Sequence, residues 1–315
     1  MDESIIYHQM TMLKNFFERE IIADYVYLDF PTHQNVGDWL IAMGAWRLLN
    51  DLPYSCIKRV SIVGFNYEWQ SIPQNAVILL HGGGNFGDLY PGATWFRNEV
   101  VKHCPNNKII FLPQTITYKN IKNIIETVSV CSLHKNLILC ARDQSSYELL
   151  KQHFTNNRCV LLPDTAWGLY DYLGKFRNPL SSRRSLVIKR NDEEFEKGFD
   201  IDDAVDVVDW QDILRIIHLP FMYMPYRIIR KLSKIKIIPA SIEKRICDLY
   251  MINVLYSYVL KNVVGYIQNY KKIYSTRLHG WILASMLQIE CEWTDTKYKK
   301  ISNYFNTWII EKANG

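Results

Sequence analysis

Three consecutive glycines follow a strongly apolar run in the first third of the 315-residue chain, within the segment AVILLHGGGNFGDLYPG (76–92). Glycine adopts positive φ without strain and lets a backbone approach a ligand closely, and the N–H groups of such a loop can bind an anion. Gly83, Gly84 and Asn85 are therefore candidate ligand-binding residues at the carboxyl end of a predicted strand. A tight strand-to-helix turn without a ligand is the alternative interpretation.

Three known glycine patterns fit this segment only in part. The spacing of Gly82, Gly84 and Gly87 matches the dinucleotide fingerprint, but the next predicted strand ends without the acid that binds a ribose. Asp88 stands where a P-loop needs its lysine. The HGGG string is typical of an esterase oxyanion loop, but the chain contains no G-x-S-x-G nucleophile motif. The segment thus predicts a ligand-binding loop without a nucleotide motif.

Arg277 and His279 stand two residues apart before an apolar helical run, in STRLHGWILASML (275–287). Residues two apart in an extended segment point the same way, so both side chains are expected to enter one site. Positive charge at a helix N-terminus opposes the helix dipole, which favours an anion bound there. A core histidine with satisfied hydrogen bonds is the alternative for His279. Arg142, at the end of the predicted strand LILCA, is a third basic candidate, with a simple salt bridge as its alternative.

Asn35 and Asp38 begin the segment NVGDWLIAMGAWRLL (35–49), whose apolar spacing predicts a helix. Asn and Asp are common helix caps, and capping alone would explain both residues. The functional interpretation is that this helix N-terminus also lines the mouth of a ligand-binding cleft.

Neither the remaining histidines nor the seven cysteines show the spacing of a metal site or a disulfide framework. We therefore expect no metal ion, and the odd number of scattered cysteines favours the reducing cytoplasm. The apolar runs are shorter than the roughly 18 residues that a membrane-spanning helix needs. The early residues carry acids and lack the apolar core of a secretory signal.

Short apolar runs alternate with helical patterns along the first half of the chain. These runs are continuously apolar, which is typical of parallel strands that are covered on both faces. Strand and helix alternation of this kind predicts a doubly wound α/β sheet. The predicted strands are 25–30, 59–63, 76–80, 109–112, 137–141 and 159–162, and helical patterns cover 93–103, 120–130 and 145–153.

A second α/β lobe is expected after a stretch rich in Pro, Gly and Ser at 163–185. We predict two Rossmann-like lobes, 1–170 and 171–315, similar to GT-B enzymes, with a cleft between them where a ligand would bind. Strands near 263–267 and 272–275 and a helix near 242–261 are expected in the second lobe.

The composition is that of an ordinary globular protein, with 48% hydrophobic and 22% charged residues. A net charge of +5 gives no reason to expect nucleic acid as a partner. Charge is segregated within an insert at 192–245, where ten acids and one base (192–212) precede eight bases and one acid (213–245). The acidic part is interpreted as a solvated face that pairs with the basic part.

The basic part of this insert, 219–245, is amphipathic. We expect one helical face with Ile228, Ile229, Leu232 and Ile235 and an opposite face with Arg227, Arg230, Lys231 and Lys234. A basic amphipathic helix is typical of peripheral membrane contact at the interface. An ordinary surface helix that packs on the core is the alternative.

In combination these segments resemble the polysaccharide pyruvyl transferase family. The resemblance spans most of the chain, and the glycine and Arg-Leu-His-Gly motifs are specific only together. The tail keeps Asp295 and Tyr298 of the family's Asp-Asn-Ser-Tyr-Gly pattern and replaces the other positions. The segments that carry the resemblance are LDFPTHQNVGDWLI, LLHGGGNFGDLYPG, IIFLPQTI, ARDQSSYELL, LLPDTAWGL and STRLHGWILASML.

The resemblance implies transfer of a pyruvyl group from phosphoenolpyruvate to two hydroxyls of a sugar, forming a cyclic ketal and releasing phosphate, without a metal or other cofactor. It implies a role in bacterial surface or capsular polysaccharide biosynthesis, on a sugar acceptor that is lipid-linked, nucleotide-linked or polymeric. His279 would act as general acid and base, with Arg277 and Arg142 holding the donor anions. Gly83, Gly84 and Asn85 would shape the donor loop, and Asn35, Asp38 and Asp88 would bind the acceptor.

Three other functions are weighed against this one. A GT-B-type glycosyltransferase that uses a nucleotide sugar would need the same fold and the same anion-binding helix start. A non-catalytic scaffold of a polysaccharide assembly complex would not need Arg277 or His279. A nicotinamide-dependent dehydrogenase is disfavoured because the ribose-binding acid is missing.

Overall fold

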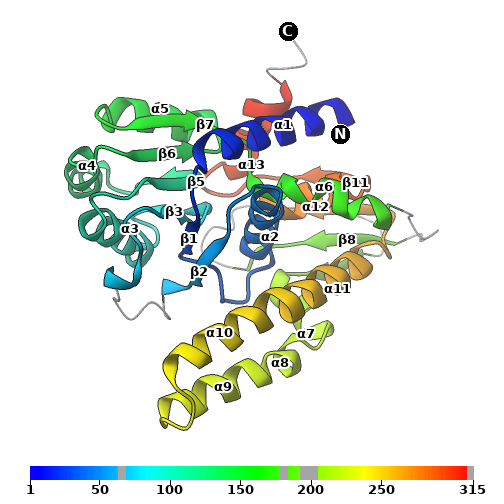
Figure 1. Ribbon diagram of the computed structural model, residues 1–315. Coiled ribbons are helices and arrows are strands. Elements are labelled where there is room, and N and C mark those ends of the chain that lie inside the picture. The colour runs from blue at the N-terminus through cyan, green and yellow to red at the C-terminus, as the bar shows by residue number, and fades with distance from the viewer. Residues whose placement is uncertain (63–68, 178–183, 192–204, 311–315) are drawn as a thin grey trace. The chain divides into compact units, whose positions relative to one another are not determined.

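The computed structural model describes residues 1–62, 69–177, 184–191 and 205–310, which form a mixed α/β protein with two compact units (Figure 1). A division of the chain at residues 170 and 171 differs from these units in two places, residues 32–40 and 298–315. Unit 1 comprises Met1–Pro31, Ile41–Tyr170 and Tyr298–Gly315, and unit 2 comprises Thr32–Leu40 and Asp171–Lys297.

Unit 1 is built on a parallel sheet, as the continuously apolar runs predict. In the described residues its strand order is β2-β1-β3-β5-β6-β7, and β4 also pairs with β5. The strands are β1 (Tyr25–Leu28), β2 (Cys56–Val60), β3 (Val77–Leu80), β4 (Gly83–Gly87), β5 (Ile109–Thr117), β6 (Leu137–Ala141) and β7 (Arg158–Leu161).

Both faces of this sheet are buried, which explains why its strands do not alternate between apolar and polar residues. On one face, Ile78 and Phe111 join Phe96 of α3 in a single core. Their neighbours Leu79 and Ile110, which point to the opposite face, are also fully buried. Figure 1 shows α3 and α4 on one side of the sheet and α1 on the other. The helices are α1 (Glu3–Glu20), α2 (Val36–Asn50), α3 (Pro91–His103), α4 (Ile124–Ser132), α5 (Gln144–His153) and α13 (Lys300–Phe305). The first residues of α2 belong to unit 2, as does most of the short helix α6 (Tyr170–Leu173).

Unit 2 has its own parallel sheet, with strand order β11-β10-β8-β9 among the described residues. Two parallel sheets confirm the α/β fold class. The strands are β8 (Ser185–Ile188), β9 (Val205–Val208), β10 (Lys272–Ser275) and β11 (Glu290–Trp293).

The strand expected at 263–267 is wrong, because these residues end helix α11 (Ser257–Ile267). Val259, Val263 and Ile267 are buried at helical spacing, so they belong to the apolar stripe of a longer helix. A short β-branched run cannot be distinguished from a buried helix segment by periodicity alone.

A helical segment lies between β9 and β10 in unit 2. Among the described residues, no helix of the chain is long and apolar enough to cross a membrane. The helices of unit 2 are α7 (Trp210–Ile216), α8 (Leu219–Met222), α9 (Met224–Lys234), α10 (Ala240–Tyr250), a π-helical turn at Met251–Tyr256, α11, and α12 (Leu278–Met286).

Candidate active site

Polar side chains of unit 1 gather where its parallel strands end. The glycine segment follows β3, Arg142 directly follows β6, and Asp164 lies just beyond β7. Since the carboxyl ends of parallel strands share one edge of the sheet, residues far apart in the sequence meet there. This edge is the usual ligand position in α/β proteins.

Arg142 is almost completely buried, and two of its nitrogens are held by the protein. Its Nη1 lies 2.7 Å from Asp164 Oδ2, and its Nε donates to Thr115 Oγ1 at 2.8 Å. The salt bridge that was the alternative for Arg142 therefore exists. The third nitrogen, Nη2, lies on the side of the glycine segment, 3.3 Å from the position that a Cβ on Gly84 would take.

Lys300 brings a second cation to the same place. Its Nζ lies 3.2 Å from the Cβ position of Gly84, on α13 near the C-terminus. An atom at that position would thus be close to hydrogen-bond distance from two cationic nitrogens. Because Gly84 has no side chain, the space between the backbone and these nitrogens suits an oxygen atom of an anionic ligand. Sequence reasoning missed Lys300, which is one of several lysines in the tail.

The glycine segment is not the strand-to-helix turn that was the alternative interpretation. Gly83–Gly87 form strand β4, which pairs with β5, and α3 begins only at Pro91. Gly83 and Gly87 adopt φ values of 112° and 124°, which favour glycine. Position 87 also requires glycine for a steric reason, because a Cβ there would lie 1.9 Å from the carbonyl oxygen of Thr117. A Cβ on Gly84 would instead meet the flexible ends of the Lys300 and Arg142 side chains.

Asn85 and His81 are tied into the support of this loop. Arg97, which is fully buried, donates through Nη2 to Asn85 Oδ1 at 2.8 Å and to the carbonyl oxygen of His81 at 3.0 Å. The same nitrogen lies 3.0 Å from Asp29 Oδ2. His81 Nδ1 lies 2.9 Å from the hydroxyl of Tyr27, whose pKa is raised well above its ordinary value by burial. His81 therefore holds the loop.

Asp88 has partners on the loop after β5. Its carboxylate accepts hydrogen bonds from the backbone N–H groups of Lys119 and Asn120 and from the side chain of Asn123. Burial raises the pKa of Asp88, but these hydrogen bonds outweigh it and hold the pKa below its ordinary value. The geometry gives Asp88 a structural role at 119–123, and its role in acceptor binding stays a prediction.

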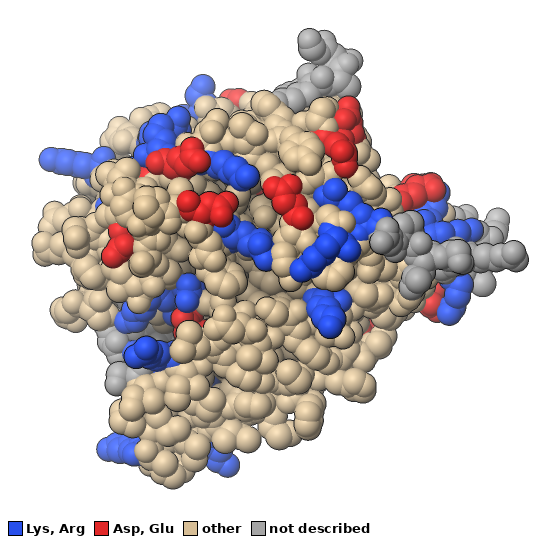
Figure 2. Space-filling view, turned by 45° about the vertical axis from the view of Figure 1, so that its right-hand side comes forward, with Lys and Arg blue, Asp and Glu red and all other residues tan. Residues whose placement is uncertain are grey.

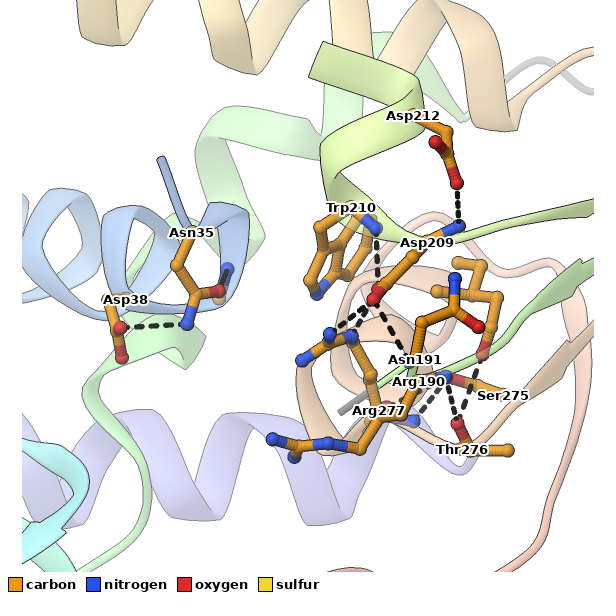
Figure 3. Close-up of polar contacts among 12 residues, drawn as sticks. Asn35, Asp38, Arg190, Asn191, Asp209, Trp210, Asp212, Ser275, Thr276 and Arg277 are labelled. Carbon is orange, nitrogen blue, oxygen red and sulfur yellow. Dashed lines mark hydrogen bonds and ion pairs between the residues drawn. The ribbon is translucent and has the colours of Figure 1, made fainter. Parts of the chain in front are cut away.

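In unit 2, a second polar cluster lies beyond three neighbouring strands. Arg190 follows β8, Asp209 follows β9 and Arg277 follows β10 (Figure 3). Arg277 Nε and Nη2 donate to the two carboxylate oxygens of Asp209, at 2.5 and 2.6 Å. The pair is largely buried, and this bidentate geometry fixes the plane of the guanidinium group.

The carboxylate of Asp209 pairs with the positive charge of Arg277, so no bound ligand is needed to explain that charge. Positive charge before α12 predicts a nearby anion, and the protein itself supplies one. Asp209 also caps α7 by accepting from the backbone N–H of Trp210. The interpretation of the acidic segment as a solvated face that pairs with the basic block is wrong for Asp209, which is buried. The carboxylate of Asp206 likewise contacts Arg184, outside that block.

His279 packs against the start of α2. A Cβ on Gly37 would lie 2.7 Å from His279 Nδ1, so the ring contacts the backbone of the first helical turn. The side chain is half-buried, which leaves one part of it in contact with solvent. The structure thus brings His279 together with the segment of Asn35 and Asp38, two of the predicted acceptor residues.

Asn35 and Asp38 form a small network at this helix start. Asn35 Oδ1 accepts from the backbone N–H of Gly37 at 3.0 Å, and its Nδ2 donates to Asp38 Oδ2 at 2.8 Å (Figure 3). His33 Nε2 lies 2.7 Å from the same carboxylate oxygen. Capping therefore occurs as expected, while His33 is a neighbour that sequence reasoning did not single out.

Within the described parts of the chain, no three His, Cys, Asp or Glu side chains are arranged to hold a metal ion. The seven cysteines are all free. Burial raises the pKa of the Cys131 thiol to about 12, so this group is no thiolate nucleophile.

Comparison with known proteins connects this geometry to one family. A sequence model described as Polysaccharide pyruvyl transferase matches residues 4–293. A Bacillus subtilis (strain 168) protein named "Putative pyruvyl transferase EpsO" is 30% identical over 287 residues, which cover 91% of this chain and 86% of that protein. "Pyruvyl transferase 1" of Schizosaccharomyces pombe (strain 972 / ATCC 24843) is 25% identical over 98% of this chain and 75% of its own length.

A solved structure shows a similar fold. It is a functionally uncharacterized protein from Klebsiella pneumoniae subsp. pneumoniae NTUH-K2044, with a TM-score of 0.58 and 16% sequence identity. The similarity covers 95% of this chain and 93% of that one. At this identity the likeness bears on the fold alone.

Proposed function

Because the chain belongs to the polysaccharide pyruvyl transferase family, we propose that it transfers the pyruvyl group of phosphoenolpyruvate to two hydroxyls of a sugar. The products are a cyclic ketal and inorganic phosphate, in the biosynthesis of a bacterial surface or capsular polysaccharide. One observation carries the proposal. A half-buried histidine, His279, and an arginine fixed by a carboxylate, Arg277, are two positions apart in the sequence where β10 meets α12.

The residues of unit 2 suit the proton transfers of this reaction. Protonation of the methylene carbon of phosphoenolpyruvate makes C2 electrophilic, and a sugar hydroxyl oxygen bonds to C2 and loses its proton. The bond between C2 and the phosphate oxygen then breaks, phosphate leaves with the electron pair, and the second hydroxyl closes the ketal and loses its proton. We assign these proton transfers to His279, since an imidazole near neutrality both gives and accepts protons.

Arginines and a lysine suit the two anionic groups of the donor. We assign carboxylate or phosphate binding to Arg277, whose fork is held in place by Asp209. We assign a second anion-binding role to Arg142 and Lys300, with Gly83, Gly84 and Asn85 as the adjacent loop. Support comes from the two cationic nitrogens that face Gly84.

The polar side chains at the start of α2 suit the binding of the sugar acceptor. Carboxylate and amide oxygens bind sugar hydroxyls, so we propose Asn35, Asp38 and Asp88 as acceptor residues. The free cysteines favour the cytoplasm as the compartment. A GT-B-like two-lobed architecture and a lipid-linked acceptor are part of the same proposal.

A transfer assay read by mass spectrometry tests the proposal directly. The purified chain is incubated with phosphoenolpyruvate and a panel of galactose-, glucose- and N-acetylhexosamine-bearing acceptors, and mass spectrometry follows the gain of one pyruvyl ketal. We expect one acceptor class to gain this mass while phosphate is released in equal amount, with or without a chelator.

The alternative transferase gives a different result in the same experiment. Thermal stabilisation by a nucleotide sugar and not by phosphoenolpyruvate, together with no ketal on any acceptor, would favour a glycosyltransferase. Loss of activity with a chelator and its return with magnesium or manganese would show that a metal takes part.

A further inference from the structure

The helical segment 219–254 of unit 2 exposes a concentration of large apolar side chains. Of the 21 exposed large hydrophobic residues among the described parts of the chain, nine lie in this segment. The segment is little more than a tenth of the chain, so scattered surface residues do not account for this number. The nine are Phe221, Met224, Ile228, Ile235, Ile237, Ile242, Ile246, Leu249 and Val254.

Helices α9 and α10 run antiparallel to each other (Figure 1), and most of these side chains lie on them. Helical spacing places Met224 and Ile228 on one face of α9, and Ile235, the C-cap residue directly after the helix, continues that face. The same spacing gives α10 an exposed stripe of Ile242, Ile246 and Leu249. Tyr226 and Cys247, which are buried, mark the opposite, inward sides of the two helices.

The exposed charges of this segment are all positive. Among the described side chains from 219 to 254, every exposed charged residue is a Lys or Arg: Arg227, Lys231, Lys234, Lys236 and Arg245. The two acids of the segment, Glu243 and Asp248, are half-buried, and Glu243 lies 3.8 Å from Arg230. Figure 2 shows the lowest part of the molecule, formed by α9 and α10, as mostly uncharged, with blue side chains at its edge and no red ones on this face.

Two details differ from the sequence prediction for this block. Ile229 and Leu232 are half-buried, so the exposed apolar stripe of α9 includes Met224 instead. Arg230 also faces the ring of Tyr226, at 5.8 Å from its centroid, and therefore belongs to the helix packing. Fewer of the predicted bases and apolar side chains of α9 are exposed, but α10 adds an exposed apolar stripe that the sequence did not predict.

We propose that this face of α8, α9 and α10 seats on a membrane surface that carries anionic headgroups. Apolar side chains flanked by cations match the interfacial layer, where the isoleucines enter the acyl boundary and the bases meet lipid phosphates. A second copy of the chain fits less well, because a symmetric dimer would bring the same cations close together. The inference goes beyond the proposed function, since it needs neither donor nor acceptor.

Vesicle co-sedimentation of the full chain tests this surface. Vesicles of phosphatidylcholine alone are compared with vesicles that also contain phosphatidylglycerol, at low and high salt. Binding should require the anionic lipid and fall with salt. In the triple variant Arg227→Gln, Lys231→Gln, Lys234→Gln, each lost base should weaken binding on the order of 5-fold, the factor that corresponds to about 1 kcal/mol.

Matched variants separate this face from general surface effects. Lys14→Gln, Lys122→Gln and Lys135→Gln remove three exposed bases of unit 1, and binding should be unchanged. Ile228→Asn with Ile235→Asn should weaken binding, whereas Ile125→Asn with Leu133→Asn, exposed on or beside α4, should not. Thermal melts check that each variant is folded.

Two results would overturn the proposal. One is equal recovery in the supernatant with both kinds of vesicle. The other is a dimer in sedimentation velocity that Ile228→Asn dissociates, which would assign the face to a second copy. Neither result depends on activity, so either is distinct from failure of the pyruvyl transfer assay.

Discussion

Two histidines next to glycine-containing motifs have opposite environments in this protein. His81 precedes the glycine segment of unit 1, is buried, and contacts the hydroxyl of Tyr27. His279 begins α12 in unit 2, is half-buried, and lies against the backbone at Gly37. His279 is therefore the histidine with access to a substrate, and the proposed proton transfers are assigned to it.

The arginine clusters of the two units also differ in the groups that surround each guanidinium. Arg142 in unit 1 is buried with Asp164 and shares the Gly84 position with Lys300, so two cations face one glycine. Arg277 in unit 2 is paired in a bidentate way with Asp209, two positions before His279 in the sequence. The proposed function accordingly assigns anion binding to the cations of unit 1 and proton transfer to unit 2.

The largest expected effect separates the two histidines. His279→Ala should lower turnover by about 100- to 10,000-fold, because a positioned acid and base is lost, while phosphoenolpyruvate still binds. His81→Ala should mainly lower the free energy of unfolding, by about 1–3 kcal/mol, because a buried hydrogen bond is broken. Steady-state kinetics and urea unfolding measure both. Near-wild-type turnover in His279→Ala would break the comparison.

The next effect separates the two carboxylates. Asp164→Ala should lower the free energy of unfolding by about 3–5 kcal/mol, because Arg142 would stay buried without its counter-ion. Asp209→Ala should raise KM for phosphoenolpyruvate by about 10- to 100-fold with a smaller change in kcat, since Asp209 positions Arg277 without touching the reacting atoms. Asp209→Asn, which keeps one acceptor oxygen, should lie between. An unchanged KM in Asp209→Ala would show that the position of Arg277 does not matter for the donor.

A smaller effect tests the place beside Gly84. Gly84→Ala puts a methyl group 3.2–3.5 Å from the ends of Lys300 and Arg142, so it should fill the proposed oxygen position. Affinity for phosphoenolpyruvate should fall about ten-fold, which is about 1.4 kcal/mol, with little change in stability. Gly87→Ala is the control, because its positive φ and the Thr117 carbonyl make it destabilise the fold. Isothermal titration and thermal melts distinguish the two variants. Unchanged affinity for phosphoenolpyruvate in Gly84→Ala would show that no donor anion binds at this position.

The remaining effect is a pH-dependent change in stability within unit 1, with no change in activity. Burial raises the pKa of the Glu20 carboxyl, but hydrogen bonds from Lys108, Arg19 and Arg158 outweigh burial and lower the pKa to about 2. A lowered pKa in the folded state contributes stability that is complete above about 4.5 and is lost as pH falls toward 2. Glu20→Gln should therefore destabilise the protein by about 1–3 kcal/mol at neutral pH and by less in acid, with kcat unchanged. Chemical unfolding at several pH values checks this, and equal destabilisation at all pH values would contradict it.

Local sequence patterns predicted the strands of unit 1 and the positions of its functional segments. Continuous apolar runs are covered on both faces, and Arg142 and the glycine segment follow strands as expected. The same patterns failed at 263–267, where a β-branched run continues a helix, and did not predict that Gly83–Gly87 would form a strand. Short runs carry too little periodicity to choose between these states.

The sequence by itself determined which residues are candidates for the chemistry: Arg142, Arg277, His279 and the glycines. Only the tertiary structure decided their partners. Asp209 is 68 positions from Arg277, and Lys300 is more than two hundred positions from Gly84. The sheets bring such residues together at strand ends, and no local pattern encodes which acid or lysine arrives there. The tertiary structure also decided that the apolar stripes of α9 and α10 are exposed, because an apolar stripe is buried only when another element packs on it.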